Sequence, residues 1–399
     1  MSKRLNSLIL DYLWLVWVIS SLSFVRFYVY VARALGYRNR MIAKPNKTRF
    51  GTPKIIFQVT TKGGIPIVQK TIDQIQEVCQ KIEYTKYEVW VVTDAEEEFR
   101  NCRTIIVPRE YSCNAVFKGR ALQYVVELRS TEKKNTNDIY VFHLDDESVV
   151  TEQTVCSILT YLENKPAPIT EGLILYPLHE NEIIKISNML DTIRPFCCFE
   201  CMEFMKKGNP AYMHGSNLLV RSDVEEKVGW DNGKTFAEDS LFAIAARKKL
   251  GSAAFGWHGA VVEEKSPRNL RDVIRQRKRW FYGLVQNLKY LTFRDKMLQV
   301  TRALIWSSGF ISGLVSIFAL LIPQDIPAVL RVFFLMASLL WLLSYQIGAF
   351  LNSRHLSRSK RLTFHLLTLA STPLIGIIEC SIPMLSVIRR PGTFEVIEK

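Results

Sequence analysis

The segment 137–150 constrains the fold more than any other part of the chain. Its apolar run over residues 139–144 ends in three consecutive acids, Asp145, Asp146 and Glu147. A continuous apolar run is typical of a strand that is buried on both faces of a parallel sheet. Ligands of open α/β sheets bind beyond the carboxyl ends of such strands, where carboxylates suit Mg²⁺ or Mn²⁺. The segment therefore predicts a divalent-cation site, and an acidic cap on a following helix is the alternative.

The surrounding sequence predicts an α/β domain. Between residues 53 and 250, strand-like apolar stretches alternate with helix-like stretches. The expected strands are 54–61, 87–94, 104–108, 139–144, 170–178 and 213–224, and the expected helices are 65–80, 116–129 and 233–251. Such alternation favours right-handed βαβ units and a mostly parallel sheet.

A hydrophobic segment precedes this domain. Residues 8–35 are long enough to span a bilayer, although Asp11 and Arg26 interrupt them. Fewer basic residues precede the segment than follow it, so the positive-inside rule places the N-terminus outside and residue 36 onward in the cytoplasm. A cleaved signal peptide is the alternative, but the apolar core is too long for one.

Hydrophobic character returns near the C-terminus. Two spans are expected at 303–322 and 328–352, and the basic link 352–361 after them is expected to be cytoplasmic. Residues 362–388 are long for one span and short for two, so we expect a re-entrant hairpin that turns near Pro373. The chain is thus predicted to be an integral, multi-pass membrane protein.

The expected organisation has four parts. These are an N-terminal transmembrane helix with a basic linker (1–49), a cytosolic α/β domain (50–269), interfacial amphipathic helices (270–300) and a C-terminal transmembrane region (301–399). The interfacial assignment follows from the basic and aromatic run Gln276-Arg277-Lys278-Arg279-Trp280 beside the expected spans.

Charge and cysteine content narrow the classes of partner. The net charge of +14 over 399 residues indicates an anionic partner. Because the chain has no Lys/Arg-rich tail and no nucleic-acid motif, a diphosphate substrate and anionic membrane lipids explain the charge better than nucleic acid. The eight cysteines form no regular framework, so reduced thiols are expected, with a metal role for the Cys-Cys-Phe-Glu-Cys run at 197–201 as the alternative.

Two later motifs could complete a site. Glu238 and Asp239 lie in the first part of the predicted helix 233–251. An acidic pair at this position can stabilise the start of the helix. If the pair instead faces the acids at 145–147, one of its carboxylates can take a proton from a hydroxyl group. In a helix Gln276 and Trp280 share a face with Arg279 beside them, which could offer a guanidinium to a leaving diphosphate and an indole to a sugar ring.

These motifs carry a family resemblance. His-Leu-Asp-Asp-Glu-Ser, Ala-Glu-Asp-Ser and Gln-Arg-Lys-Arg-Trp, in this order, resemble the D-x-D, E-D and Q-x-x-R-W marks of the membrane-bound family 2 glycosyltransferases. The Glu-Lys-Ser-Pro before the last motif and the His-Leu-Asp-Asp-Glu form of the first are similar to the egghead-type β-1,4-mannosyltransferases. The resemblance covers most of residues 50–290.

The resemblance implies a Rossmann-like GT-A fold and a role for each matching residue. Asp145 and Glu147 match the metal-binding places, with Asp146 the competitor of Glu147. Asp239, beside Glu238, matches the general base. The remaining implied donor-binding residues are Thr60, Thr61 and Asp94 for nucleobase and ribose, Lys118 and Arg120 for phosphates, and Gln276, Arg279 and Trp280 for diphosphate and acceptor. Trp280 is expected near the acceptor and His214 near the acceptor or the metal, and a hydrogen-bonded structural histidine is the alternative for His214.

The expected function follows from these assignments. The resemblance implies an inverting, metal-dependent transfer of mannose from GDP-mannose, in β-1,4 linkage, onto a membrane-associated glycolipid, with Mg²⁺ or Mn²⁺ as cofactor. The alternatives are a processive polysaccharide synthase that uses a UDP-sugar and a non-catalytic membrane scaffold. No residue of the sequence by itself distinguishes guanine from uracil.

Overall fold

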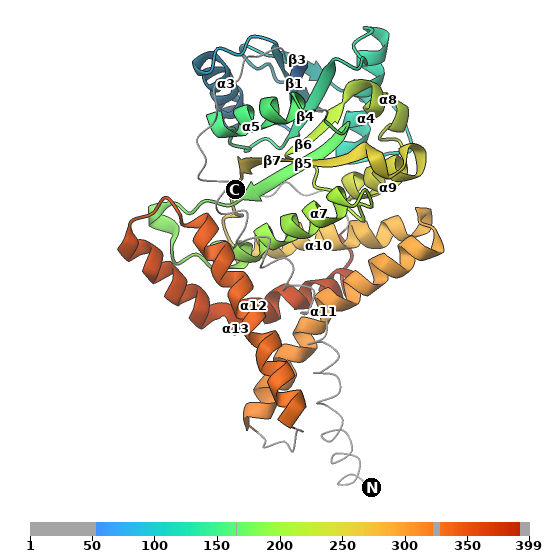
Figure 1. Cartoon of the computed structure of the whole chain (residues 1–399). Coiled ribbons are helices and arrows are strands. Elements are labelled where there is room, and N and C mark those ends of the chain that lie inside the picture. The colour runs from blue at the N-terminus through green and yellow to red at the C-terminus, as the bar shows by residue number, and fades with distance from the viewer. Residues whose placement is uncertain (1–52, 165, 322–327, 392–399) are drawn as a thin grey trace.

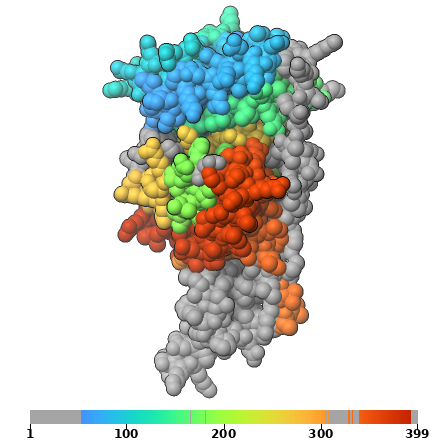
Figure 2. Space-filling model, turned by 90° about the vertical axis from the view of Figure 1, so that its left-hand side faces the viewer, coloured from blue at the N-terminus to red at the C-terminus, as the bar shows by residue number. Residues whose placement is uncertain are grey.

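A computed structural model describes residues 53–164, 166–321 and 328–391. The expected transmembrane segment 8–35 lies outside these residues. In Figure 1 a sheet domain occupies the upper part of the molecule, and long C-terminal helices lie beneath it. The view in Figure 2 shows the same order, with the N-terminal half of the sheet domain in blue above the C-terminal helices in red and orange.

The sheet of the described part of the chain has seven strands in the order β3-β2-β1-β4-β6-β5-β7. Their bounds are β1 Lys54–Thr61, β2 Tyr87–Thr93, β3 Arg103–Ile106, β4 Ile139–Leu144, β5 Ile169–Leu175, β6 Leu218–Arg221 and β7 Phe255–Glu263. The first four strands pair in parallel, as does β5 with β7, whereas β6 is antiparallel to both neighbours. The prediction of a mostly parallel sheet is confirmed.

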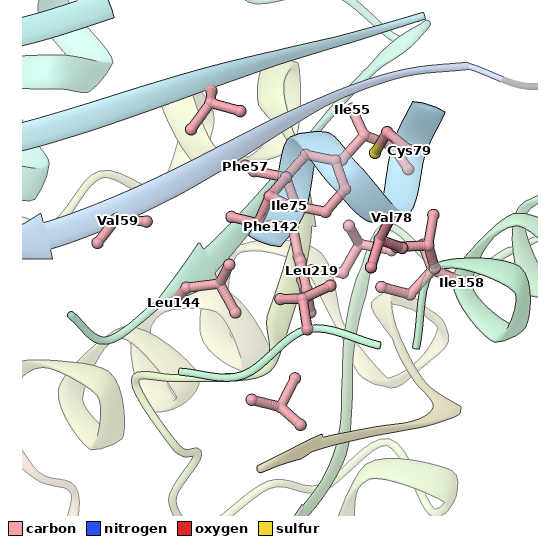
Figure 3. Close-up of a cluster of buried hydrophobic side chains, with 14 of the residues drawn as sticks. Ile55, Phe57, Val59, Ile75, Val78, Cys79, Phe142, Leu144, Ile158 and Leu219 are labelled. Atoms are coloured by element: carbon pink, nitrogen blue, oxygen red, sulfur yellow. The ribbon is translucent and has the colours of Figure 1, made fainter. Parts of the chain in front are cut away.

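Helices cover both faces of the sheet. The alternating side chains of β1 separate these faces: Phe57 packs in a core with α3 (Ile65–Lys81) and α5 (Glu152–Leu162), and Ile56 packs against α4 (Phe117–Thr131) on the other side. Figure 3 shows the first of these clusters, with Phe57 and Phe142 meeting Ile75 and Val78 of α3. The core explains why the strand runs are apolar throughout.

The structure corrects one sequence-based boundary and adds one strand. Only residues 218–221 of the predicted strand 213–224 form a strand, because helix α8 (Ser222–Val228) follows at once and residues 213–217 form a loop. Strand β7 was not predicted. Its glycines weaken the strand pattern, and Gly259 has φ +72° where the pairing with β5 shifts register.

A helical layer separates the sheet from the C-terminal helices. It contains α7 (Arg194–Lys206) and α10 (Leu270–Asn287), which lie between the sheet and α11–α13 in Figure 1. The C-terminal helices are α11 (Phe293–Leu321), α12 (Ala328–Asn352) and α13 (Arg358–Ile388). The remaining helices of the described part are α6 (Ile186–Leu190), α9 (Glu238–Leu250) and the short 3-10 turns Glu180–Glu182, Asp191–Ile193, Ser252–Ala254 and Leu288–Tyr290.

The re-entrant hairpin predicted over 362–388 is wrong. Helix α13 is continuous and includes Pro373 and Pro383. Proline cannot donate to the carbonyl four residues earlier, and for Pro383 that carbonyl belongs to Glu379. The indole Nε1 of Trp306, on α11, donates to it at 3.2 Å. A tertiary hydrogen bond thus satisfies the acceptor and lets the helix continue.

The membrane predictions for the C-terminal region have partial support. Within the described residues, α13 is the helix whose length and apolar composition would let it cross a membrane. The predicted spans 303–322 and 328–352 coincide largely with α11 and α12, and their crossing of a membrane stays a prediction. The basic link after α12 lies against the sheet domain, because Arg354 pairs with Glu263 at the end of β7 at 3.0 Å.

Candidate active site

One cavity of about 480 Å³ gathers the side chains that follow the strands and those of helices α7 and α9–α13. The loops after β1, β2 and β4 contribute to it because the carboxyl ends of these parallel strands share one edge of the sheet. Of the predicted site residues, those that line the cavity are Thr60, Thr61, Asp94, Lys118, Asp145, Asp146, Glu147, His214, Glu238, Asp239, Gln276, Arg279 and Trp280. Residues that are distant in sequence therefore line the same cavity.

Arg120 is the predicted residue that does not line this cavity. Its guanidinium binds the carbonyls of Pro108 and Tyr111, at 3.1 and 3.3 Å, and reaches Asp94 at 3.3 Å. These bonds hold the loop before α4 and the carboxylate of Asp94 in place. A direct contact of Arg120 with phosphates has no support in this arrangement.

Three carboxylates form the most concentrated acidic group. Oxygen atoms of Asp145, Glu147 and Glu264 all lie within 4.8 Å of one another. Sequence reasoning missed Glu264, which follows β7. A backbone bridge brings it there: the Val149 N–H donates to the Glu263 carbonyl at 2.7 Å, and the Glu263 N–H donates back at 3.2 Å.

The surroundings of Glu264 suit a cation. Burial and the negative charge of Asp145 raise the pKa of Glu264, and the charge of Arg194 acts in the opposite direction. Its Oε2 accepts from the Tyr176 hydroxyl at 3.0 Å, and its buried Oε1 has no hydrogen-bond partner among the described residues. Oxygen ligands of this kind fit Mg²⁺ or Mn²⁺.

Lys118 neutralises part of this charge. Its Nζ donates to Asp145 Oδ1 at 2.6 Å and to the Gly215 carbonyl at 3.0 Å. Burial opposes the charged form, but the charges of Asp145 and Glu238 outweigh it and raise the pKa of Lys118. The preceding residue, Phe117, has φ +54°, an unfavourable conformation for an aromatic residue, and its ring is held in a stack with Phe236 at 4.9 Å.

The acidic pair opens α9, as the sequence predicted. Asp239 Oδ1 accepts from the Ser240 N–H at 2.7 Å. Burial raises the pKa of Glu238 and Asp239, the charge of Asp239 raises that of Glu238 further, and Lys118 acts against the shift on both. A carboxyl with a raised pKa is better matched to accept a proton near neutral pH than an ordinary one.

Helix α10 packs tightly against this pair. A Cβ added at Gly283 would lie 2.7 Å from the Ala237 Cβ, so only glycine permits the approach. Asn287 Nδ2 donates to the Ala237 carbonyl at 3.1 Å, and the Gly283 carbonyl accepts from Thr235 at 3.2 Å. These contacts place the Gln-x-x-Arg-Trp residues of α10 beside Asp239.

The basic run on α10 is divided between two environments. Arg279 lines the cavity, where burial lowers its pKa and Glu238 and Asp145 act in the opposite direction. Arg277 is 1% exposed and pairs with Asp191 at 2.6 Å and with Glu379 of α13. Arg277 therefore lies on the buried face of α10 and joins the 3-10 turn Asp191–Ile193 to α13, and the interfacial position of the helix stays a prediction.

His214 lies in the loop before β6. Its backbone N–H donates to Glu171, and its Nε2 lies 4.0 Å from the Cys201 Sγ. Neighbouring Gly215 approaches Asp239, since an added Cβ would lie 3.4 Å from Oδ2. The loop thus places His214 near the acidic pair.

The cavity extends beyond the predicted residues. Its further lining comes from α7, α10–α13 and the loop before β6, with the aromatic side chains Tyr212, Phe281, Trp306, Trp341 and Tyr345 and the charged side chains Arg194, Glu200, Arg277, Arg302 and Glu379. We call this part the inner chamber. Sequence reasoning predicted none of these as site residues, because each, apart from Arg277, lies in a stretch that reads as an ordinary helix or loop.

The comparisons with known proteins agree with this geometry. The family described as glycosyl transferase family group 2 matches residues 140–350, more than half of the chain. The chain belongs to this family. This family 2 glycosyltransferase has the mixed α/β, GT-A-like fold that the resemblance implied, so the family, enzyme class and domain fold are confirmed.

Curated relatives are similar over part of their length. The chain is 31% identical over 288 residues to "Beta-1,4-mannosyltransferase egh" of Drosophila melanogaster, which covers 69% of this chain and 62% of that protein. It is 29% identical over 246 residues to "Beta-1,4-mannosyltransferase bre-3" of Caenorhabditis elegans, with 59% and 53% covered. The chain thus spans less than two thirds of each of these relatives.

Among solved structures, the chain is similar to the mannosyltransferase PcManGT from Pyrobaculum calidifontis in complex with GDP-Man and Mn²⁺. The TM-score is 0.49 at 14% identity, over 90% of this chain and 98% of that chain. It is also similar to mannosyl-3-phosphoglycerate synthase from Rubrobacter xylanophilus, with a TM-score of 0.38 at 12% identity, over 60% and 77% of the two chains.

Proposed function

We propose that this glycosyltransferase transfers mannose from GDP-mannose, with inversion and in β-1,4 linkage, onto a sugar that is linked to a membrane lipid. The observation that carries the proposal is the convergence of the metal-type acids, Lys118, Arg279 and Asp239 on one cavity. The names of the relatives support mannose and the linkage. The family resemblance supports GDP as the nucleotide.

In the proposed mechanism Asp239 is the general base. It accepts the proton of the acceptor hydroxyl while that oxygen forms a bond to the anomeric carbon and the bond from that carbon to the diphosphate breaks. Attack on the face opposite the leaving group inverts the configuration. The raised pKa of Asp239 supports this role, because a base works best when its pKa approaches the operating pH.

Two cations of the same cavity are proposed to stabilise the leaving group. Lys118 and Arg279 lie where negative charge builds up on GDP, and buried cations stabilise such charge more strongly than exposed ones. Asp145, Glu147 and Glu264 would hold Mg²⁺ or Mn²⁺, which when bound neutralises charge on the diphosphate. Asp146, whose Oδ2 accepts from Thr61 at 3.2 Å, is proposed to support this loop.

The nucleoside is proposed to bind at the ends of β1 and β2. Thr60, Thr61 and Asp94 line that part of the cavity. Asp94 is held by Arg120, which leaves its carboxylate oriented for a ribose hydroxyl or a base N–H. The threonine hydroxyls supply further hydrogen-bonding groups.

Attachment to a membrane is part of the proposal, with several spans and the catalytic domain in the cytoplasm. The exposed side of α13 supports it, because large apolar residues gather there: Leu362, Leu366, Leu369, Leu374, Met384, Val387 and Ile388. A group of exposed large apolar side chains on one helix is typical of a surface that contacts lipid or another protein. The apolar composition of α11, α12 and residues 8–35 supports the same arrangement.

The decisive experiment measures transfer by the purified full chain in lipid nanodiscs. We expect mannose transfer from GDP-mannose to a glucosylated lipid with Mg²⁺ or Mn²⁺, and loss of transfer on chelation. Glu147→Gln should lower activity and metal affinity, whereas Glu152→Gln, which alters an exposed acid of α5 outside the cavity, should change neither. A long polymer made from a UDP-sugar would indicate the processive synthase, and no acceptor-dependent GDP release would indicate the scaffold.

A further inference from the structure

The lining of the inner chamber differs from the set of residues proposed to act on the donor. Its walls come from α7, α10, α11, α12 and α13, and it opens into the same cavity as Asp239. Trp280 marks the transition, with the Arg194 guanidinium 4.0 Å from its ring centre. Arg194 also donates to the Tyr176 hydroxyl at 2.9 Å, so it is held in place.

Aromatic rings form much of the chamber wall. Trp306 meets Phe281 edge-on at 5.6 Å, and Trp341 meets Tyr345 in the same way at the same distance. The Trp341 indole lies directly on the backbone of α13, where a Cβ added at Gly376 would be 1.9 Å from the ring. Rings held this rigidly offer flat apolar faces at low entropic cost.

The charges of the chamber are largely paired within the protein. Arg302 of α11 binds Glu200 of α7 at 2.8 Å and lies 3.6 Å over the Tyr212 ring, and Tyr212 donates to Glu200 at 2.7 Å. Arg277 pairs with Glu379, as described above. A phosphate group beside the Glu200–Arg302 and Arg277–Glu379 pairs would meet cations whose charge is already compensated, together with two carboxylates that repel it.

Hydrogen-bonding capacity nevertheless remains. The Nη1 of Arg302 is buried and has no hydrogen-bond partner among the described residues. These features match a sugar ring. Its C–H groups can pack on the flat aromatic faces, and its hydroxyls can bind the paired charged groups and the spare N–H donor.

We infer that the inner chamber binds an uncharged sugar ring of the acceptor, packed on Trp306 and Trp341 with hydroxyls bound by the Glu200–Arg302 pair. The inference rests on the proposed function and makes it more specific: it names the residues that bind the acceptor sugar and that exclude a lipid with a phosphate headgroup. The chamber residues determine this specificity, while the groups around Asp239 act on the donor.

The first test compares acceptors with the unchanged full chain in nanodiscs. A glucosylated lipid should accept mannose at least about 100-fold more efficiently, in kcat/KM, than a polyprenyl phosphate, a difference that one uncompensated buried charge would produce. Comparable efficiency with both lipids, or a preference for the phosphate, overturns the inference while leaving mannose transfer established.

The second test uses variants. Trp341→Leu and Arg302→Gln should each raise KM for the glucosylated lipid about tenfold or more, and leave the Kd for GDP-mannose within about twofold. Trp257→Leu is the matched control, because Trp257 is also half-buried but lies outside the cavity. An unchanged KM in both chamber variants overturns the inference.

The third test does not depend on turnover or on removing a packed residue. Methyl β-glucoside should quench the tryptophan fluorescence of the unchanged protein, and hexyl phosphate at equal concentration should not. Ala303→Phe, which fills the chamber from α11, should abolish the quenching. Quenching by hexyl phosphate alone, or quenching that Ala303→Phe leaves intact, overturns the inference. Glucoside-specific quenching without any mannose transfer supports the chamber assignment and refutes the proposed donor chemistry instead.

Discussion

Asp239→Asn removes the proposed base and keeps the shape of the side chain. The amide oxygen can accept from the Ser240 N–H, as Oδ1 does at 2.7 Å, so the start of α9 should be preserved. The change also removes one of two adjacent carboxylates whose burial is unfavourable, and hence relieves repulsion with Glu238. We therefore expect folding stability to hold or to rise slightly.

The catalytic effect should be large. General-base catalysis contributes about 100- to 10,000-fold, which corresponds to about 3–5 kcal/mol of transition-state stabilisation. We expect kcat to fall by that factor. Donor binding should be kept or slightly strengthened, because Lys118 and Arg279 lose a negative neighbour and attract the diphosphate more strongly.

Single-turnover transfer of radiolabelled mannose measures the chemical step, and calorimetry measures GDP-mannose affinity. Asp223→Asn is the matched control, since Asp223 pairs with Arg221 and lies outside the cavity. A variant that keeps more than about a tenth of wild-type turnover would refute the base assignment, since that residual rate corresponds to less than 1.4 kcal/mol. Loss of donor affinity in proportion to activity would refute it as well.

Three further predictions concern other parts of the protein. Burial raises the pKa of Asp239, and the base must be deprotonated to act. In a pH–rate profile, kcat should therefore begin to fall, as the pH is lowered, at a higher pH than it would for an ordinary aspartate with a pKa of about 4. Glu225, fully buried against Arg129, has its pKa lowered to about 2, because the charges of Arg129 and His143 outweigh the opposing effect of burial. Glu225→Gln should therefore cost about 3–5 kcal/mol of unfolding free energy at neutral pH. The contribution from ionised Glu225 is present in full above the unfolded-state pKa and disappears as pH falls toward 2, so urea titrations of both proteins should converge at low pH. Gly283→Ala, which would add about 1 kcal/mol of stability to an exposed helix, should here lower both Tm and kcat because the new Cβ meets Ala237; an unchanged kcat would show that α10 need not pack so closely.

Local patterns in the sequence were enough to predict the sheet domain. The apolar runs of β1, β2 and β4 each end in polar or acidic residues, and in a parallel sheet such ends must meet at one edge. That rule predicted the site at Asp145–Glu147, and the family resemblance added Asp94 at the end of β2. The motifs at 238–239 and 276–280 were recognised from their residue types, and the family resemblance then implied their roles.

Long-range contacts explain what was missed. Glu264 belongs to the acidic group because Val149 and Glu263 form a backbone bridge, and no local signal announces that pairing. Pro373 and Pro383 suggested a turn, yet the packing of α13 and the Trp306 hydrogen bond to the Glu379 carbonyl keep the helix continuous.

The sequence by itself determined the class of this protein, because strand runs, their terminal acids and three ordered motifs are short-range features that the chain carries in any conformation. The tertiary structure alone decided which aromatic and charged residues of α7 and α10–α13 face the inner chamber. Apolar helices show the same hydrophobic pattern whether they face lipid, protein or a cavity, so the direction of Trp306, Trp341 and Arg302 depends on how five helices pack.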